Sequence, residues 1–170
     1  MVYLCFFWRI YPNYKQKPTI IVKDDLDWKI LELLQENARL PFAHIGRVVG
    51  LSPSAVAERV QRLEDTEVIT GYTTQVNPAK LGWSLSAFIM MSVNRINFQS
   101  FTDALDADAY PEMVECTRVT GKDCLIMKFH VKDSKHLEEV INRLAQHGDP
   151  TTLLILNELM KNGAIGRYTH

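Results

Sequence analysis

The sequence predicts an α+β protein in which a helix-turn-helix unit precedes a strand-rich unit. Apolar residues recur at helical spacing from residue 26 to residue 63, and after residue 83 strand-like runs alternate with helical ones. The 170-residue chain is 46% hydrophobic and 23% charged, which is typical of a globular protein of one or two small domains. We predict an extension at 1–23, a helix-turn-helix domain, with or without a wing, at 24–72, a linker at 73–82, a second domain at 83–160 and a tail at 161–170.

The first unit begins with two amphipathic helices. Asp24 or Asp25 can cap the first helix, and Asp27 in its first turn complements the helix dipole. The second helix starts near Pro41 and contains Gly46, which costs about 1 kcal/mol relative to alanine. We therefore expect a close approach of helices at Gly46. The apolar residues of the two helices are Leu26, Ile30, Leu33, Leu34, Phe42, Ile45 and Val49.

The third helix follows a short turn. Gly50 can end the preceding helix, Ser52 can cap the next one, and Pro53 suits the first helical position. The buried stripe is Val56, Val60 and Leu63, and the outward residues are Ser54, Ala57, Glu58, Gln61 and Arg62. Small residues at the start of a helix and arginines further along suit the major groove of DNA. After this helix, residues 68–72 alternate like a strand and could form a short wing or linker strand.

Charge and cysteine content restrict the classes of function. The net charge is −1, yet residues 39–62 carry four arginines, at 39, 47, 59 and 62, against Glu58 alone. The three cysteines show no paired spacing and the five histidines no ligand spacing, so we expect reduced thiols, no metal and no cofactor. The longest apolar run falls short of a membrane span. Residues 1–23 are expected to be weakly ordered, to pack on a partner subunit or to follow from a start codon placed too far upstream, and an export signal is not expected.

The second unit reads as strand, helix, two strands, helix and strand. The expected strands are 85–93, 113–120, 124–131 and 151–157, and the expected helices are 98–106 and 134–147. Ser134 is the expected cap of the last helix and Gly148 its stop. This βαββαβ order is the ferredoxin-like motif, in which both helices cover one face of the sheet. We expect dimerisation to bury the other face, with Leu85, Ile89, Met91 or Val93 turned outward.

Several motifs together point to a known family. They are Asp25-Leu26-Asp27-x-x-Ile30-Leu31, Asn37-Ala38-Arg39-Leu40, Gly50-Leu51-Ser52, Arg59-Val60-x-Arg62-Leu63-Glu64, Val68-Ile69-x-Gly71-Tyr72, Asn77-Pro78-x-x-Leu81-Gly82, and the segments 111–116 and 119–124. In this order and spacing, over residues 24 to 160, they closely resemble the Lrp/AsnC family of transcriptional regulators. One departure is Glu67, where the family usually has glycine. A left-handed glutamate there would be strained by about 1–2 kcal/mol.

The resemblance implies a cytoplasmic, sequence-specific DNA-binding regulator without enzyme activity. In this family the second domain dimerises, often assembles further into octamers, and binds amino acids between dimers. The residues expected to contact double-stranded DNA are Arg39, Ser52, Ser54, Ala57, Glu58, Arg59 and Arg62. Most of them have a structural alternative. Arg59 could instead pair with Glu64 or Asp65, and Arg62 is similar. Ser52 could act as a helix cap, and solvated helix surface would carry the same residue types as Ser54, Ala57 and Glu58.

The expected effector site is the turn of the central hairpin with the start of the last strand. Its residues are Gly121, Lys122, Asp123, Cys124, Thr151 and Thr152. Gly121 permits close backbone approach, and Asp123 could receive the ammonium group of an amino acid. The alternatives are an ordinary hairpin turn and, for the two threonines, β-branched strand residues without a ligand.

Two other functions compete with this interpretation. A siroheme decarboxylase-like enzyme would share the architecture, but it needs histidines and arginines around a tetrapyrrole pocket. The second domain offers only three arginines, Arg95, Arg118 and Arg143. The other alternative is an effector-binding interaction module whose DNA-binding half is silent. The recognition helix contains no internal proline and no acidic run, which disfavours that alternative.

Overall fold

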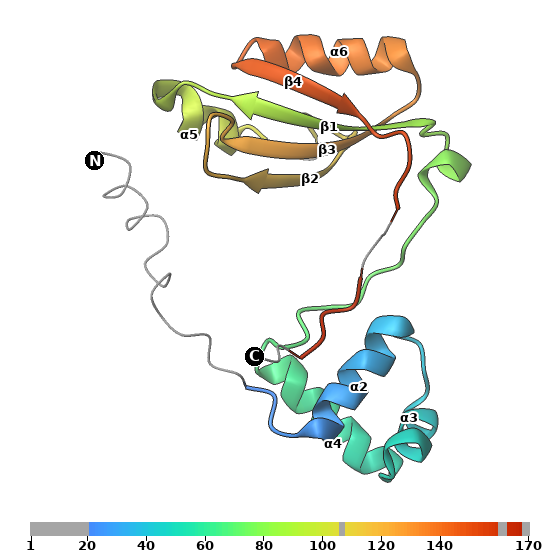
Figure 1. The fold of residues 1–170 in the computed structure, drawn as a ribbon. Helices are drawn as coiled ribbons and strands as arrows, with labels where there is room; N and C mark the ends of the chain where they lie inside the picture. The colour runs from blue at the N-terminus through green and yellow to red at the C-terminus, as the bar shows by residue number, and fades with distance from the viewer. Residues whose placement is uncertain (1–20, 106–107, 160–162, 168–170) are drawn as a thin grey trace. The chain divides into compact units, whose positions relative to one another are not determined.

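The computed structural model describes residues 21–105, 108–159 and 163–167 (Figure 1). The chain divides into one unit formed by Met1–Thr73 with Asn162–His170, and another formed by Thr74–Lys161. Residues 1–20 of the predicted extension and residue 106, the predicted end of a helix, lie outside the described residues.

In its described residues, the first unit is a helix-turn-helix preceded by one further helix, as predicted. Its helices are α2 (Asp25–Glu36), α3 (Phe42–Val49) and α4 (Pro53–Asp65). Asp24 caps α2 by accepting from the Asp27 N–H at 2.9 Å, and Ser52 caps α4 by accepting from the Ala55 N–H at 3.2 Å. The buried apolar cluster joining the helices is Ile30, Leu34, Ile45, Val56 and Val60.

Two glycines shape the turn between α3 and α4. Gly50 ends α3 in the left-handed conformation, with φ at 75°. Gly46 is buried, and a Cβ there would lie 2.5 Å from the backbone oxygen of Leu51. The predicted close approach at Gly46 is therefore present, and its nearest neighbour is the turn backbone that leads into α4.

The exit from α4 is not a wing strand. The backbone N–H groups of Val68 and Ile69 both donate to the Leu63 oxygen at 2.9 Å, so they complete the helix end and cannot join a strand ladder. The strand predicted at residues 68–72 is therefore wrong. Between them and the helix, Glu67 takes a left-handed conformation with φ at 56°, so the strain of about 1–2 kcal/mol expected for a non-glycine residue applies here.

Residues near the end of the chain return to the helical unit. The side chain of Gln35 forms two hydrogen bonds with the backbone of Ile165, at 2.7 Å to its N–H and 3.2 Å to its oxygen. Arg167 pairs with Asp25 at 2.7 Å. These contacts place residues 163–167 along α2, so the helical unit is built from two separate stretches of the chain.

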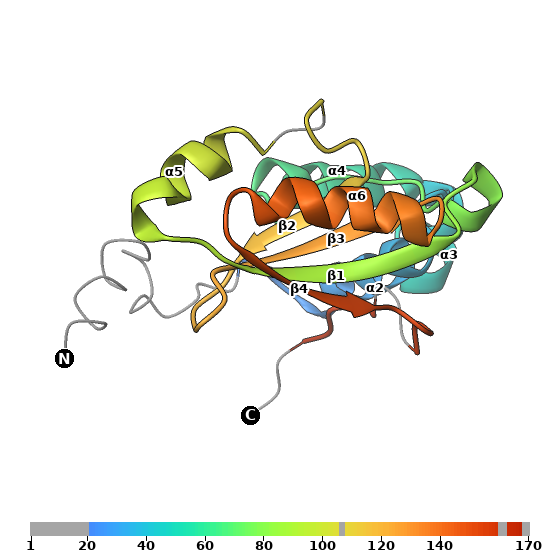
Figure 2. The same ribbon diagram turned by 90° about the horizontal axis from the view of Figure 1, so that it is seen from above.

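The second unit is an antiparallel four-stranded sheet covered by helices on one face. After a short 3₁₀ helix, η1 (Pro78–Leu81), its elements are β1 (Leu85–Ser92), α5 (Arg95–Asp103), β2 (Met113–Arg118), β3 (Leu125–Val131), α6 (Ser134–Ala145) and β4 (Asp149–Leu154). The strand order is β2-β3-β1-β4, which confirms the predicted βαββαβ, ferredoxin-like topology. Figure 2 shows α6 lying over the sheet. The core contains Ile89, Met91, Phe101, Tyr110, Leu125, Met127, Phe129, Val131, Val140 and Leu144.

The faces of β1 are the reverse of the prediction. Ile89 and Met91 are fully buried beneath the helices, and Leu85 and Val93 pack against the same core. Successive strand residues point to opposite faces, so the open face carries the alternate set. With its cross-strand neighbours, that set is Phe88, Met90, Ile126, Lys128, Thr151 and Leu153.

The ends of α6 also differ from the prediction. Asp133, one residue earlier than expected, caps the helix by accepting from the His136 N–H at 2.8 Å. The helix ends at Ala145, before Gly148. A Cβ on Gly148 would lie 2.3 Å from the Ser92 oxygen, so this glycine serves a close approach to the end of β1 rather than a helix stop.

We predict that Gly46→Ala destabilises the helical unit by about 1–3 kcal/mol, because the new methyl group overpacks the turn. This loss should exceed the gain of about 1 kcal/mol in helix propensity. The measurement is denaturant unfolding of the full chain. Gly50→Ala is the control, since that position has open space and only its backbone conformation is strained. A more stable Gly46→Ala variant would contradict the close approach.

Candidate nucleic-acid interface and effector site

The first turns of α4 present short side chains to solvent. Ser52 and Ser54 are exposed, and their hydroxyl oxygens lie 3.0 Å apart in a hydrogen bond. Glu58 is exposed and Ala57 is half-buried. Residues 54, 57, 58 and 61 follow the three- and four-residue spacing of one helix face. This face is therefore free of bulky groups at its start, which allows close approach of a groove.

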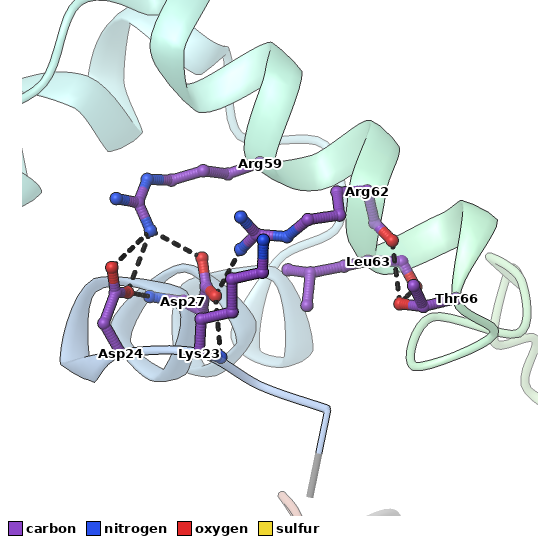
Figure 3. A network of polar contacts seen from close by, with 7 residues as sticks. All are labelled: Lys23, Asp24, Asp27, Arg59, Arg62, Leu63 and Thr66. Carbon is purple, nitrogen blue, oxygen red and sulfur yellow. Dashed lines mark hydrogen bonds and ion pairs between the residues drawn. The ribbon is translucent and has the colours of Figure 1, made fainter.

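The two arginines of α4 point toward α2, as Figure 3 shows. Arg59 Nη1 lies 2.8 Å from both carboxylate oxygens of Asp24 and 2.8 Å from Asp27 Oδ1. Arg62 Nη2 donates to Asp27 Oδ2, which also accepts from the Lys23 N–H at 3.1 Å. These four side chains, Asp24, Asp27, Arg59 and Arg62, form what we call the arginine clamp.

The clamp holds its charges at different depths. Asp27 is 0% exposed, whereas the Arg59 and Arg62 side chains keep 23% and 31% of their surface exposed. A buried carboxylate is tolerated only when cations and hydrogen bonds satisfy it, and here both oxygens are satisfied. The Asp27 N–H, followed by Arg59, lowers the pKa of Asp24, and hydrogen bonds to Asp24 and Asp27 raise the pKa of Arg59.

The local partners considered for Arg59 bond to other residues. Glu64 accepts from the Tyr72 hydroxyl at 2.7 Å, and Asp65 accepts from the Gln61 amide at 2.9 Å. Burial, followed by the bond to Glu64, raises the pKa of Tyr72 to about 12. The pairing of Arg59 with Glu64 or Asp65 is therefore wrong, and its carboxylate partners are Asp24, the N-cap of α2, and Asp27 in its first turn.

Two further arginines of the helical unit are exposed. Arg39 lies in the turn before α3, where its backbone N–H donates to Asn37 Oδ1 at 2.9 Å. Arg47, in the last turn of α3, donates from Nε to the Ala43 oxygen at 3.4 Å. Arg47 was counted for its charge but not among the candidate contacts, although its exposure makes it comparable to Arg39.

The expected effector turn is fixed to the end of β1. The Cys124 N–H donates to the Met91 oxygen at 2.8 Å, and the Val93 N–H lies 3.4 Å from Cys124 Sγ. Gly121 has φ at 138°, a conformation that favours glycine. Gly121 and Lys122 are exposed, and Asp123 and Cys124 are half-buried.

The start of β4 lies at the same end of the sheet. Met91 pairs with Leu125 of β3 on one side and with Pro150 of β4 on the other, so the turn and β4 flank the end of β1. Two strand spacings, about 10 Å, separate them. The two threonines face opposite sides, because Thr151 pairs with Met90 on the open face and Thr152 pairs with Ile89 beneath the helices. Each face of the sheet therefore carries only one of the two threonines.

A buried carboxylate that sequence reasoning missed joins β2 to α6. Glu112 is 6% exposed, and its Oε1 accepts from Arg143 Nη2 and from His136 Nε2, each at 2.8 Å. His136 Nδ1 accepts from the Lys132 N–H at 3.3 Å, which makes Nε2 the donor. Burial alone would raise the pKa of Glu112, but its hydrogen bonds and Arg143 outweigh burial and lower it. The only sequence signal was its place in the segment 111–116.

In the part of the chain that the structure describes, no group of three or more histidine, cysteine, aspartate or glutamate side chains could hold a metal ion. No helix in that part is long and apolar enough to cross a membrane. Cys116 and Cys124 are free thiols, and burial raises the pKa of Cys116.

Comparison with known proteins agrees with both units. Residues 24–64 match the AsnC-type helix-turn-helix domain, and residues 86–165 match the Lrp/AsnC ligand-binding domain. The chain is 38% identical over 134 residues to the uncharacterized HTH-type transcriptional regulator YezC of Bacillus subtilis, covering 79% of this chain and 94% of YezC. It is 30% identical over 141 residues to the regulator LrpC of the same organism, covering 82% and 96%.

Solved structures show the same architecture. Bacillus subtilis LrpC superposes with a TM-score of 0.71 at 29% identity, covering 81% of this chain and 97% of LrpC. A Neisseria meningitidis transcriptional regulator in complex with L-Met gives a TM-score of 0.77 at 27% identity, covering 84% and 96%. A helix-turn-helix joined to a βαββαβ ligand-binding domain defines a DNA-binding regulator. The chain belongs to the Lrp/AsnC family of transcriptional regulators.

This assignment bears on the first of the two alternative functions, the enzyme. The matched relatives are transcriptional regulators and not enzymes, which confirms the prediction of a regulator over a siroheme decarboxylase-like enzyme.

We predict that Asp24→Asn lowers the thermal midpoint at pH 7 and that the difference from the parent shrinks in acid. The folded pKa of Asp24 is lowered, so its contribution is present above the ordinary aspartate pKa of about 4 and is lost as the pH falls through the folded value. Asparagine also caps helices, so the substitution removes the charge and keeps the cap. Thermal scans from pH 7 to pH 2.5 test this, with the exposed Glu58→Gln as control. A difference independent of pH would contradict the prediction.

Proposed function

We propose that this regulator binds specific DNA sequences as a cytoplasmic dimer or higher assembly whose DNA affinity responds to an amino acid. The observation that carries the proposal is the exposed, sterically open start of α4. The residues proposed to serve DNA binding are Arg39, Ser52, Ser54, Ala57, Glu58, Arg59 and Arg62, the last two as members of the arginine clamp. Ser54, Ala57 and Glu58 are proposed to meet base edges, with Glu58 accepting from a cytosine amino group. Ser52 has a hydroxyl at a helix start, where phosphate is favoured.

The open face of the sheet supports dimerisation. Phe88, Met90 and Ile126 are half-buried there, and the Leu153 residue is 49% exposed. Among the described residues no helix covers this face, and an apolar sheet face of this kind favours association with a second copy. A two-fold dimer would place its recognition helices in successive major grooves about 34 Å apart.

The end of the sheet near Gly121 supports an effector site. Asp123 offers a carboxylate to an ammonium group, and the exposed Gly121 and Lys122 leave room for close approach. The Neisseria relative, solved with L-Met, makes an amino acid the first ligand class to test. An amino acid would change DNA binding only through a difference in its affinity for two states of the assembly.

The proposal is tested by fluorescence anisotropy on DNA from the chain's own upstream region, in a salt series with and without each amino acid. We expect tight binding over random DNA, with a log–log salt slope of several units, and a shift with one or a few amino acids. Equal binding to random DNA at every salt concentration would overturn sequence-specific regulation. An unchanged curve with every amino acid would overturn the effector assignment alone.

We predict that Asp123→Ala weakens the response to the effector at least tenfold and leaves DNA binding without effector unchanged, because the substitution removes the charge that would meet an ammonium group. The measurement is the amino acid concentration that gives half of the anisotropy shift. Glu138→Ala, which removes an exposed carboxylate from α6, is the matched control. Identical effector titrations for the parent and Asp123→Ala would contradict the assignment of this turn.

A further inference from the structure

We propose that Asp27 is a positioning residue for DNA binding: its buried carboxylate holds Arg59 and Arg62 so that α4 keeps one rotation relative to α2. In this role the two arginines bond to carboxylates of their own domain, and other cations of the protein contact the phosphates of DNA. The inference deepens the proposed function and rests on it.

The geometry of the clamp restrains rotation of α4 about its axis. Each oxygen of Asp27 receives a different arginine, and the arginines lie three residues apart on α4. A rotation that keeps one bond stretches the other. Apolar contacts are not directional, so the buried Val60 and Leu63 fix the distance of α4 from the core more than its rotation. Charge-assisted bonds are directional and supply that restraint.

The charges of the clamp cancel. Two carboxylates and two guanidinium groups give it no net charge, so these arginines add little to the field that attracts DNA. The hydrogen bonds of Arg59 described above are all made by Nη1, which is shared between Asp24 and Asp27. Arg39 and Arg47 are exposed. The bond described above for Arg39 uses only its backbone N–H, and the one for Arg47 uses one guanidinium nitrogen, Nε, on a backbone carbonyl oxygen and not on a carboxylate. Their charged groups are the better candidates for phosphate.

Counterion release separates the two roles. A cation that neutralises one phosphate adds about 0.9 to the log–log salt slope of binding to duplex DNA. An arginine that stays paired with Asp27 releases no counterion when DNA binds. Its loss should therefore weaken binding at every salt concentration without changing the slope.

The experiment uses the full chain and the duplex that the parent selects from a random pool. Anisotropy gives the affinity and salt slope of Asp27→Asn, Arg59→Gln, Arg62→Gln and the control Arg39→Gln, and circular dichroism confirms folding at the same temperature. We expect at least tenfold weaker binding for the three clamp variants. The magnitude of their log–log salt slope should be at most about half a unit smaller than the parent's. Arg39→Gln should reduce that magnitude by about one.

Parent-like affinity of folded Asp27→Asn, or a slope lowered by about one in both Arg59→Gln and Arg62→Gln, would overturn the inference. If Asp27→Asn does not fold, Arg59→Lys decides, because lysine keeps the charge but lacks the planar fork of guanidinium. We expect Arg59→Lys to bind at least fivefold more weakly at an unchanged slope, and parent-like affinity would overturn the positioning role. A parent that selects no duplex would instead overturn the proposed function, and this inference with it.

Discussion

The carboxylate of Asp27 is the point on which the helical unit depends. It lies fully buried between α2 and α4, and the described residues of this unit form three short helices around a small apolar cluster. A charge so placed destabilises the fold unless cations reach it, and both cations come from the recognition helix. The same helix must present its outer face to DNA. Folding of the unit and the orientation of its functional surface are therefore determined by one set of contacts.

Local sequence signals were sufficient to predict the helix caps of this unit but not the ion pairs of Asp27. The caps at Asp24 and Ser52 could be predicted because a cap bonds to a backbone N–H three residues away. Asp27 was interpreted as a dipole residue of the first turn, since its partners lie 32 and 35 residues further along the chain. A single sequence shows charges, and the pairing of distant charges emerges only when the helices pack.

The sheet shows a second limit of prediction. Its topology could be predicted from the alternation of strand and helix patterns. Which residues of β1 face the helices could not be predicted in this way. Both alternate sets of β1 are apolar, with Ile89 and Met91 on one and Phe88 and Met90 on the other, so period-two patterning cannot tell which set the helices cover. The effector candidates show the same effect, because Thr151 and Thr152 are neighbours in sequence and point to opposite faces.

The contacts of residues 163–167 with α2 have a consequence for how this protein can be divided. The helical unit is discontinuous in sequence, since Gln35 and Asp25 bond to residues that follow the second unit, Thr74–Lys161. A fragment that stops at Thr73 thus contains the helix-turn-helix but lacks one of its natural packing segments. The thermal stability of this fragment would therefore differ from that of the helical unit in the intact chain. In this protein, one continuous stretch of sequence does not contain the whole helical unit.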